Sequence, residues 1–180
     1  MKRQIRRGCF ETNSSSTHAI CIATEDVYDI PDRISFGFGE FGWSFDKLSS
    51  RRERANYLYT CLVDLIDDKN FDEFKTRLNF ITSTLIKNGV KDIDFDDYPQ
   101  ICLYVYGGDG ELHYYIKPND GYVDHSGCAL DFIDKVCSDE KMLLDYLFSD
   151  KSFILTGNDN SDDDVAINVE YPHEEFYKGN

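Results

Sequence analysis

Residues 101–116 of the chain read ICLYVYGGDGELHYYI, which is the pattern of a β-hairpin. Residues 101–106 and 111–116 are both rich in aliphatic and aromatic side chains that favour strands. The segment between them, 107–110, holds three glycines and one aspartate and is typical of a turn. We therefore predict two antiparallel strands joined by a four-residue loop.

Two helices are predicted before this hairpin, because apolar residues recur there at i, i+3 and i+4. The first covers roughly residues 48–67 and the second roughly 71–88. The ends of the second helix are well marked. Asn70 can cap its first amides, Glu73 stands where a capping-box acid reaches back, and Gly89 can adopt the left-handed conformation that ends a helix.

Shorter elements complete the pattern. Helical periodicity returns over 128–137 and 140–149, with Asp139 as the N-cap of the second segment. Short strands are predicted at 4–11, 17–23, 152–156 and 165–171, an irregular strand or tight loop at 34–43, and a polar loop at 157–164. Helices grouped between strand hairpins favour an α+β fold. We predict a single domain over residues 1–180, with a mostly antiparallel sheet, two longer central helices and one or two shorter helices packed on it.

The length and composition limit the class of protein. The chain has 180 residues and a mass of 20.8 kDa, the size of one domain. Hydrophobic residues make up 41% of it, which is enough for a packed core. No apolar run reaches the roughly 18–20 residues that span a bilayer, and no signal-peptide stretch follows the basic start. We therefore expect a cytoplasmic protein that does not bind a membrane.

Charge is distributed unevenly along the chain. The 34 acidic and 19 basic residues give a net charge of −15, yet residues 1–18 are basic and residues 139–175 are strongly acidic. A negative field repels a nucleic-acid backbone and attracts basic surfaces. The sequence therefore disfavours nucleic-acid binding by the body of the domain and favours a basic protein partner, although acidity alone also serves solubility.

The six cysteines show neither metal-binding nor disulfide spacing. None belongs to a C-x-x-C pair, and Cys61 and Cys102 lie within apolar runs, where a free thiol packs as a small hydrophobic group. We expect reduced thiols, no structural metal and no cofactor. The set is Cys9, Cys21, Cys61, Cys102, Cys128 and Cys137.

The most distinctive polar segment, called here the N-terminal signature, is RRGCFETNSSSTH at residues 6–18. Guanidinium groups, hydroxyls and an amide gathered in a turn are suited to hold an anion such as a phosphate group. Ser15 with His18 as its base would instead be a nucleophile, and a third alternative is an ordinary turn that binds nothing. The candidate anion ligands are Arg6, Arg7, Asn13, Ser14, Ser15 and Ser16.

This signature resembles the opening of a group of small uncharacterised proteins of Gram-positive bacteria and their phages, with the pattern RRGxFETNSSSTH. Four short segments further along the chain, 39–43, 57–60, 122–125 and 156–160, resemble pieces of the same group. The resemblance implies a phage or mobile element as the setting. Small acidic proteins in that setting often oppose host defence by blocking an enzyme that handles nucleic acid, which is an association of setting alone.

Two further polar clusters could join the signature at one site. Asp124 and His125 belong to the first cluster, and residues 158–160 form the second. If all three clusters meet, they supply the nucleophile, base and orienting residue types of a hydrolytic site. The recognised phosphate-loop and nucleophile-elbow motifs are absent from the sequence. The catalytic candidates are then Ser15, His18, Asp124 and His125.

The acidic loop, residues 159–164, is a candidate partner-binding surface. Glu170 stands at the twelfth position counted from Asp159, as in a calcium-binding EF-hand loop. Asp164, however, stands where that loop needs glycine, so the sequence does not predict a metal site. The candidate partner-binding residues are Asp159, Asp162, Asp163 and Asp164.

Glycines alternate with aromatic residues in the segment that contains Gly37, Gly39 and Gly42. Glycine at such positions lets a backbone approach a ligand closely. The aromatic side chains between them are more typical of a core. The segment therefore has two interpretations, a ligand-binding loop or a tightly packed part of the core.

The sequence favours a non-enzymatic binding protein over an enzyme. We expect an acidic cytosolic domain, of phage or mobile-element type, that docks on a basic, nucleic-acid-handling host defence protein and blocks it. The alternative is a nucleotide- or phosphate-binding protein or enzyme. In it Arg6 and Arg7 hold the phosphate, Ser14–Ser16 and Asn13 surround it, and His18 or His125 moves a proton. A structural role in a larger assembly is a third alternative.

Overall fold

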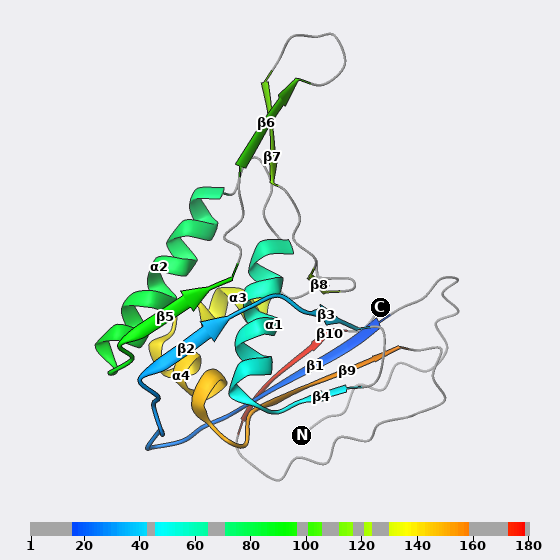
Figure 1. The fold of residues 1–180 in the computed structure, drawn as a ribbon. Helices are drawn as coiled ribbons and strands as arrows, with labels where there is room; N and C mark the ends of the chain where they lie inside the picture. Colours follow the sequence, from blue (N-terminus) through cyan, green and yellow to red (C-terminus); the bar gives the residue numbers. More distant parts are fainter. Residues whose placement is uncertain are drawn as a thin grey trace.

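The structure is a computed structural model, and it confirms the predicted α+β class with a mostly antiparallel sheet (Figure 1). For residues 101–105, 112–116 and 173–178 it describes the backbone only. The described residues are 16–42, 46–64, 71–96, 101–105, 112–116, 121–123, 130–158 and 173–178. Their helices are α1 (Arg51–Asp64), α2 (Phe71–Lys87), α3 (Leu130–Val136) and α4 (Glu140–Phe148).

The largest sheet has the strand order β10-β1-β9-β4, and every neighbouring pair in it is antiparallel. Its strands are β1 (Ser16–Ala23), β4 (Asp46–Leu48), β9 (Phe153–Asn158) and β10 (His173–Lys178). Helices α1, α3 and α4 gather on one side of this sheet in Figure 1. Ile20 and Ile22 of β1 and Ile154 of β9 are buried in the same cluster as the helical core residues.

Two small parallel pairs join distant parts of the chain. β2 (Arg33–Phe36) pairs with β5 (Asp92–Phe95), and β3 (Glu40–Phe41) pairs with β8 (Tyr122–Val123). These parallel pairs were not predicted, because residues close in sequence do not reveal which distant strand lies alongside. Both pairs lie against α1, the first through β2 and the second through β8.

The predicted hairpin is confirmed as an antiparallel pair. β6 (Ile101–Val105) pairs with β7 (Leu112–Ile116), and Leu103 lies opposite Tyr114. It forms a sheet of its own, which Figure 1 shows standing away from the helices and from the large sheet. The predicted loop at 107–110 lies outside the described residues.

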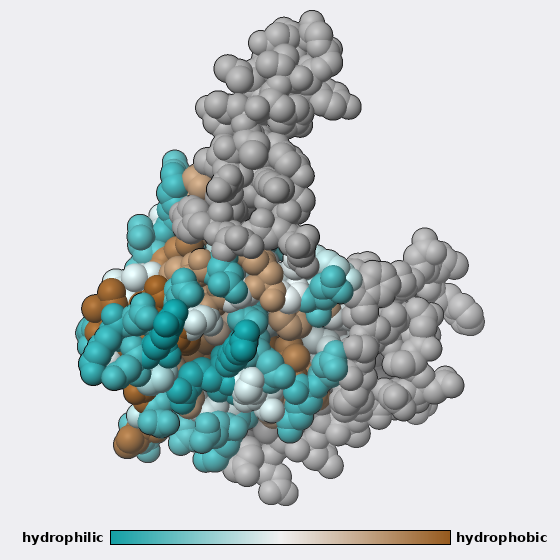
Figure 2. Space-filling view, in the orientation of Figure 1, coloured by the Kyte–Doolittle hydropathy of each residue, from teal (hydrophilic) through white to brown (hydrophobic). Residues whose placement is uncertain are grey.

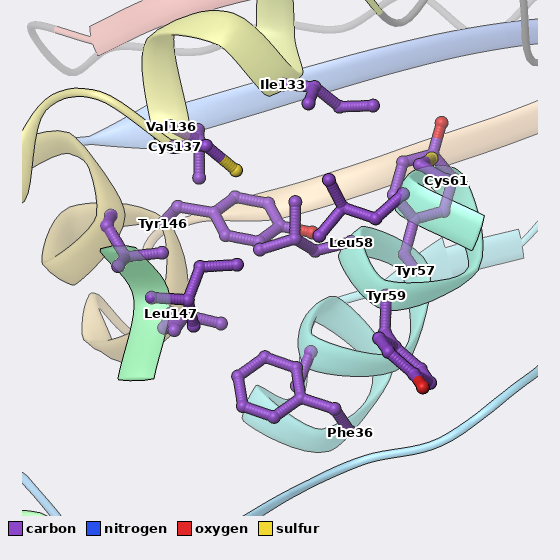
Figure 3. Packing of buried hydrophobic residues seen from close by; sticks show 14 of the residues in the cluster. Phe36, Tyr57, Leu58, Tyr59, Cys61, Ile133, Val136, Cys137, Tyr146 and Leu147 are labelled. Carbon is purple, nitrogen blue, oxygen red and sulfur yellow. The ribbon is translucent and has the colours of Figure 1, made fainter. Parts of the chain in front are cut away.

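The core centres on α1, which is buried on nearly every side from Arg54 to Val63. This helix lies in the middle of the fold although its sequence includes several polar residues, whereas an amphipathic helix covers a surface. Figure 3 shows Leu58 of α1 converging with Ile133, Val136 and Tyr146 of the two shorter helices. By contrast, α2 buries one stripe, made of Phe74, Leu78, Ile81 and Leu85.

The helix ends partly follow the prediction. Asp139 caps α4 by accepting a hydrogen bond from the Met142 amide at 2.9 Å, and Gly89 after α2 has φ of +107°. Glu73 binds Arg77 at 2.5 Å, and the amide that Glu73 was predicted to reach belongs to a residue outside the described ranges. Asn70 lies outside the described residues.

A capping box that sequence analysis missed begins α1. The Glu53 carboxylate accepts hydrogen bonds from the amides of Ser49 and Ser50 at 3.1 and 2.8 Å. The Ser50 hydroxyl accepts one from the Glu53 amide at 3.2 Å. The S-x-x-E spacing of residues 50–53 was the available signal, and it places the start of the helix at Arg51 rather than near residue 48.

The strand ends near the C-terminus differ from the prediction. β9 continues through Gly157 and Asn158, two residues into the predicted loop, because both residues pair with the start of β1. Lys178, expected to lie outside regular structure, belongs to β10 and pairs opposite His18. The predicted strands at 4–11 and 165–171 lie outside the described residues.

Candidate functional site

The structure brings the edges of two predicted polar clusters together at one end of the large sheet. Ser16 starts β1, and Asn158 ends β9 directly opposite it. Ser16 belongs to the N-terminal signature, and Asn158 belongs to the cluster at 158–160. Signature and acidic loop therefore continue from adjacent positions on two paired strands.

Most predicted site residues lie outside the part of the chain that the structure describes. Ser16 is described by its backbone alone, and His18 is the catalytic candidate whose side chain is placed. The predicted site residues outside the described ranges are Arg6, Arg7, Asn13, Ser14, Ser15, Asp124, His125, Asp159, Asp162, Asp163 and Asp164.

His18 lies in the core, where 1% of its surface is exposed. Its Nδ1 and the Tyr57 hydroxyl of α1 lie 3.0 Å apart and share a hydrogen bond. The available signal was the apolar run that follows His18 in the predicted strand, and from Ile20 to Ala23 every residue of β1 is buried. The placement shows a buried, hydrogen-bonded histidine between sheet and helix.

Burial also controls the protonation of the tyrosine next to it. Removal from water raises the pKa of Tyr57 well above its ordinary value of 10.0, with smaller contributions from Cys61 and Tyr146. Tyr146 of α4 behaves in the same way and donates a hydrogen bond to the Arg54 carbonyl at 2.6 Å. These hydroxyls therefore stay protonated, and they link α1 to the sheet and to α4.

Arg54 is a buried cation that sequence reasoning missed, with 2% of its surface exposed. Its guanidinium donates hydrogen bonds to the carbonyls of Leu147 at 2.9 Å and Ser149 at 3.0 Å, where α4 ends. It also donates to the Ser152 carbonyl at 2.6 Å and to the Ser49 carbonyl. The last carbonyls of a helix attract a cation, so Arg54 closes the end of α4.

The buried position of Arg54 affects its protonation. Loss of water around the guanidinium lowers the pKa of Arg54 below its ordinary value. Carbonyl groups of the backbone, rather than a carboxylate, accept the hydrogen bonds that the structure gives it. This arrangement gives the carbonyls at the end of α4 a buried donor and so has a structural role, while Nε of the guanidinium has no hydrogen-bond partner among the described residues.

A second polar cluster holds the loop after β1 against α4. Buried Asp145 accepts hydrogen bonds from the Glu25 amide at 2.9 Å, the Tyr28 hydroxyl at 2.6 Å and Lys141 Nζ at 3.0 Å. Burial, then the bond to Asp145, raises the pKa of Tyr28. Burial lowers the pKa of Lys141, but hydrogen bonds to Tyr28 and Asp145 outweigh that effect, and the net shift is upward.

The polar groups of this cluster form hydrogen bonds with one another and hold their protons. Tyr28 donates its proton toward Asp145, and Lys141 keeps its own, so neither group is an available base. The cluster of Asp145, Tyr28 and Lys141 therefore fixes a loop and does not form a catalytic site.

The glycine segment after β2 approaches α1 rather than a ligand. The Gly37 amide donates to Asn56 Oδ1 at 2.8 Å, and the Gly39 amide donates to Thr60 Oγ1 at 3.2 Å. One turn further along α1, Asp64 Oδ2 accepts from the Val123 amide at 2.5 Å. Residues at i, i+4 and i+8 of one helix thus provide a row of acceptors for passing backbone amides.

The close approach of two backbone segments requires glycine at position 121. A Cβ added to Gly121 would lie 3.0 Å from the backbone N and O of Gly39 and 2.7 Å from the Phe38 Cβ. A Cβ added to Gly37 would lie 2.9 Å from Asp96 Oδ2. The core interpretation of this segment is therefore the one that the geometry fits.

Metal and thiol chemistry find no support in the residues that the structure places. Among them no three His, Cys, Asp or Glu side chains gather as metal ligands. Cys21, Cys61 and Cys137 are buried, and burial raises the pKa of Cys137 to about 12. No helix within the described ranges is both long and apolar enough to cross a membrane.

Described basic side chains are largely engaged by acidic ones. Arg33 pairs with Asp92 at 3.2 Å and Asp94 at 3.4 Å, across the β2–β5 pair. Further pairs are Arg51–Asp29, Lys75–Asp72, Arg77–Glu73, Arg77–Asp134, Lys87–Glu140, Lys91–Asp32, Lys141–Asp145 and Lys151–Glu25. The surface positive charge is thus locally neutralised.

Comparison with protein-family models, with curated proteins and with solved structures finds no match to this chain. Its function must be inferred from the chemistry of its own residues. The features that bear on it are the excess of acidic residues, the engaged basic side chains and the adjacency of Ser16 and Asn158.

Proposed function

We propose that the chain is an acidic binding protein that docks on a basic, nucleic-acid-handling protein of a host cell and blocks it. The observation that carries this proposal is that most basic side chains that the structure places are paired with acids or buried, while acidic residues are in excess. The chain has a net charge of −15, and ion pairs or burial engage most of the basic side chains that the structure places. The field around the protein is therefore negative and attracts a basic partner.

The described surface is consistent with that role. Figure 2 shows mainly hydrophilic residues over the face that carries β2 and β5. Asp92 and Asp94 expose 59% and 50% of their side chains there, and Asp96 is exposed beside them. One arginine, Arg33, offsets this group on the β2–β5 pair. A strongly basic surface could approach this face without repulsion.

The acidic loop is the surface on which we place the main contact. It holds Asp159, Asp162, Asp163 and Asp164 and continues from Asn158 at the end of β9. The phage or mobile-element setting implied by the N-terminal signature fits a protein that opposes a host enzyme, and the proposal adopts it. Binding is expected to be steered by charge and weakened by salt.

Displacement of DNA tests the proposal. A fluorescent duplex is bound by a basic DNA-binding protein, and the chain is added while anisotropy is followed. We expect the chain to release the duplex at low salt and to release none at several-fold higher salt. The variant in which Asp159, Asp162, Asp163 and Asp164 are all changed to Lys is expected to release no DNA.

A charge-matched control separates the acidic loop from net charge. It carries four Lys substitutions at exposed acids elsewhere, namely Asp26, Glu40, Asp131 and Asp150. This control should retain most of the displacement. Salt-independent release would contradict the charge argument, and loss of activity in Arg6→Ala with retention in the loop variant would support the phosphate-ligand alternative.

A further inference from the structure

Among the described elements, the β6–β7 hairpin is the one that stands apart from the core. Its two strands pair with each other and with no further strand in the described chain. Neither strand makes more than marginal contact with any other described helix or strand. In Figure 1 the hairpin extends away from the body. An isolated two-stranded hairpin is only marginally stable in water, so something must stabilise this one.

The register divides the hairpin into two unlike faces. Residues directly opposite each other in an antiparallel pair share a face, and neighbours along a strand alternate. One face therefore carries Cys102, Tyr104, His113 and Tyr115. The other is wholly apolar apart from one tyrosine hydroxyl and carries Ile101, Leu103, Val105, Leu112, Tyr114 and Ile116. This second set is called here the apolar hairpin face.

Charge around the hairpin points to the kind of partner. Neither strand contains Asp, Glu, Lys or Arg, and the one titratable nitrogen in the pair is that of His113, on the face opposite the apolar hairpin face. Acids outnumber bases in the adjoining sequence, which holds one lysine, Lys117, against Asp96 and Asp97 before β6, Asp109 and Glu111 between the strands, and Asp120 after β7. An apolar surface bordered by charged residues is typical of a protein interface, in which the centre is dry and the rim is polar.

The same charges argue against a second copy as the occupant. Two copies joined through the apolar hairpin face would bring their acidic flanks together, and each carries a net charge of −15. Like charges placed across an interface cost affinity and slow the encounter. A partner with an apolar patch bordered by lysine or arginine would match both the centre and the rim.

We propose that the apolar hairpin face is the anchor by which the chain holds its basic protein partner, inserting into an apolar groove rimmed by lysine or arginine. This inference rests on the proposed function and adds the chemistry of the contact. The acidic loop and the acidic flanks steer the approach and make the charged contact, and burial of the apolar hairpin face adds an apolar contact to it. In the complex, the partner buries the apolar hairpin face and so stabilises the hairpin.

Calorimetry on the full chain with three synthetic peptides tests the inference. The first is an amphipathic leucine/lysine peptide, the second its leucine/glutamate counterpart, and the third oligolysine. The leucine/lysine peptide is expected to bind best, with a negative heat-capacity change from apolar burial. The variant Leu103→Thr/Tyr114→Thr should lose about tenfold or more of this affinity. Threonine is used because it retains strand propensity.

The matched control changes the opposite face, as Tyr104→Thr/Tyr115→Thr, and should bind the leucine/lysine peptide within about twofold of the unchanged chain. Equal losses in both variants would overturn the inference, because the hairpin would then act only through its folding. Oligolysine binding as tightly as the leucine/lysine peptide, with no change of affinity in either variant, would overturn the proposal that the apolar hairpin face anchors the partner. The proposed function would stand.

Two other results would be decisive. If the leucine/glutamate peptide binds as tightly as the leucine/lysine peptide, the basic rim is wrong, and the proposed function fails with it. If sedimentation shows a dimer of the unchanged chain that Leu103→Thr/Tyr114→Thr dissociates, a second copy occupies the apolar hairpin face. That outcome overturns the inference and leaves the charge-based function untouched.

Discussion

The region around α1 and the β6–β7 hairpin are both rich in aliphatic and aromatic residues, yet their surroundings differ completely. From Arg54 to Val63, α1 is covered by the large sheet, the two parallel pairs and the shorter helices. The hairpin pairs only with itself among the described elements. The comparison shows that an apolar segment must be buried to be stable. Whether another part of the fold or a partner buries it is decided by the tertiary structure.

The largest expected effect lies at the polar centre of the α1 region. Arg54→Ala leaves the carbonyls at the end of α4 without their buried donor and opens a cavity, so we expect a loss of about 3–5 kcal/mol in the free energy of unfolding. Urea denaturation measures it. The neighbouring Arg52, which is exposed, provides the control, and Arg52→Ala should change stability by less than about 0.5 kcal/mol. Equal effects would show that Arg54 does not close α4.

A leucine in each region gives the direct comparison. Leu58 is fully buried, so Leu58→Ala should cost about 2–5 kcal/mol. Leu103 lies on the apolar hairpin face, and Leu103→Ala should cost less than about 1 kcal/mol in the free chain. Thermal unfolding of both variants measures the difference. A large loss at Leu103 would mean that the body of the fold covers the hairpin.

Alkaline pH should weaken the α1 region selectively. Tyr57 and Tyr146 have pKa values raised well above 10.0 by burial, so the folded chain keeps protons that the unfolded chain releases above about pH 10. Stability should therefore be flat with respect to these groups below about pH 9 and fall above pH 10, by about 1.4 kcal/mol per pH unit for each tyrosine. Tyr28 and Lys141, whose pKa values are also raised, act in the same direction.

Denaturation at several alkaline pH values measures this slope, and Tyr57→Phe should reduce it. Absorbance titration of tyrosinate supplies an independent check. If all 12 tyrosines ionised near pH 10 while the chain remained folded, the buried hydroxyls would not be protected as described.

The smallest expected effect compares a buried threonine of α1 with an exposed threonine of α2. Thr60 and Thr76 both donate to the carbonyl four residues earlier at 2.8 Å, but Thr60 also accepts the Gly39 amide. Thr60→Val should therefore cost about 1 kcal/mol, and Thr76→Val on the exposed face of α2 less than about 0.5 kcal/mol. Urea denaturation separates the two values. Identical losses would show that the Gly39 hydrogen bond adds nothing.

Local patterns predicted the elements because they report neighbours within one turn of a helix or along one strand. Apolar spacing predicted α2 nearly to its ends, and Asp139 was predicted correctly as the cap of α4. The glycine and aspartate turn predicted the pairing of β6 with β7. The same reasoning missed the capping box of Ser50 and Glu53, although its spacing was visible.

The candidate site was less predictable, because its description depends on contacts between distant residues. The sequence determined the α+β class, the excess of acidic charge and the positions of the polar clusters, since composition and short-range periodicity suffice for these. Only the tertiary structure decided that His18 lies in the core and that Ser16 faces Asn158. It alone gave Arg54 its role, because the carbonyls at the end of α4 lie 93 and 95 positions further along the chain, and no local pattern records such a contact.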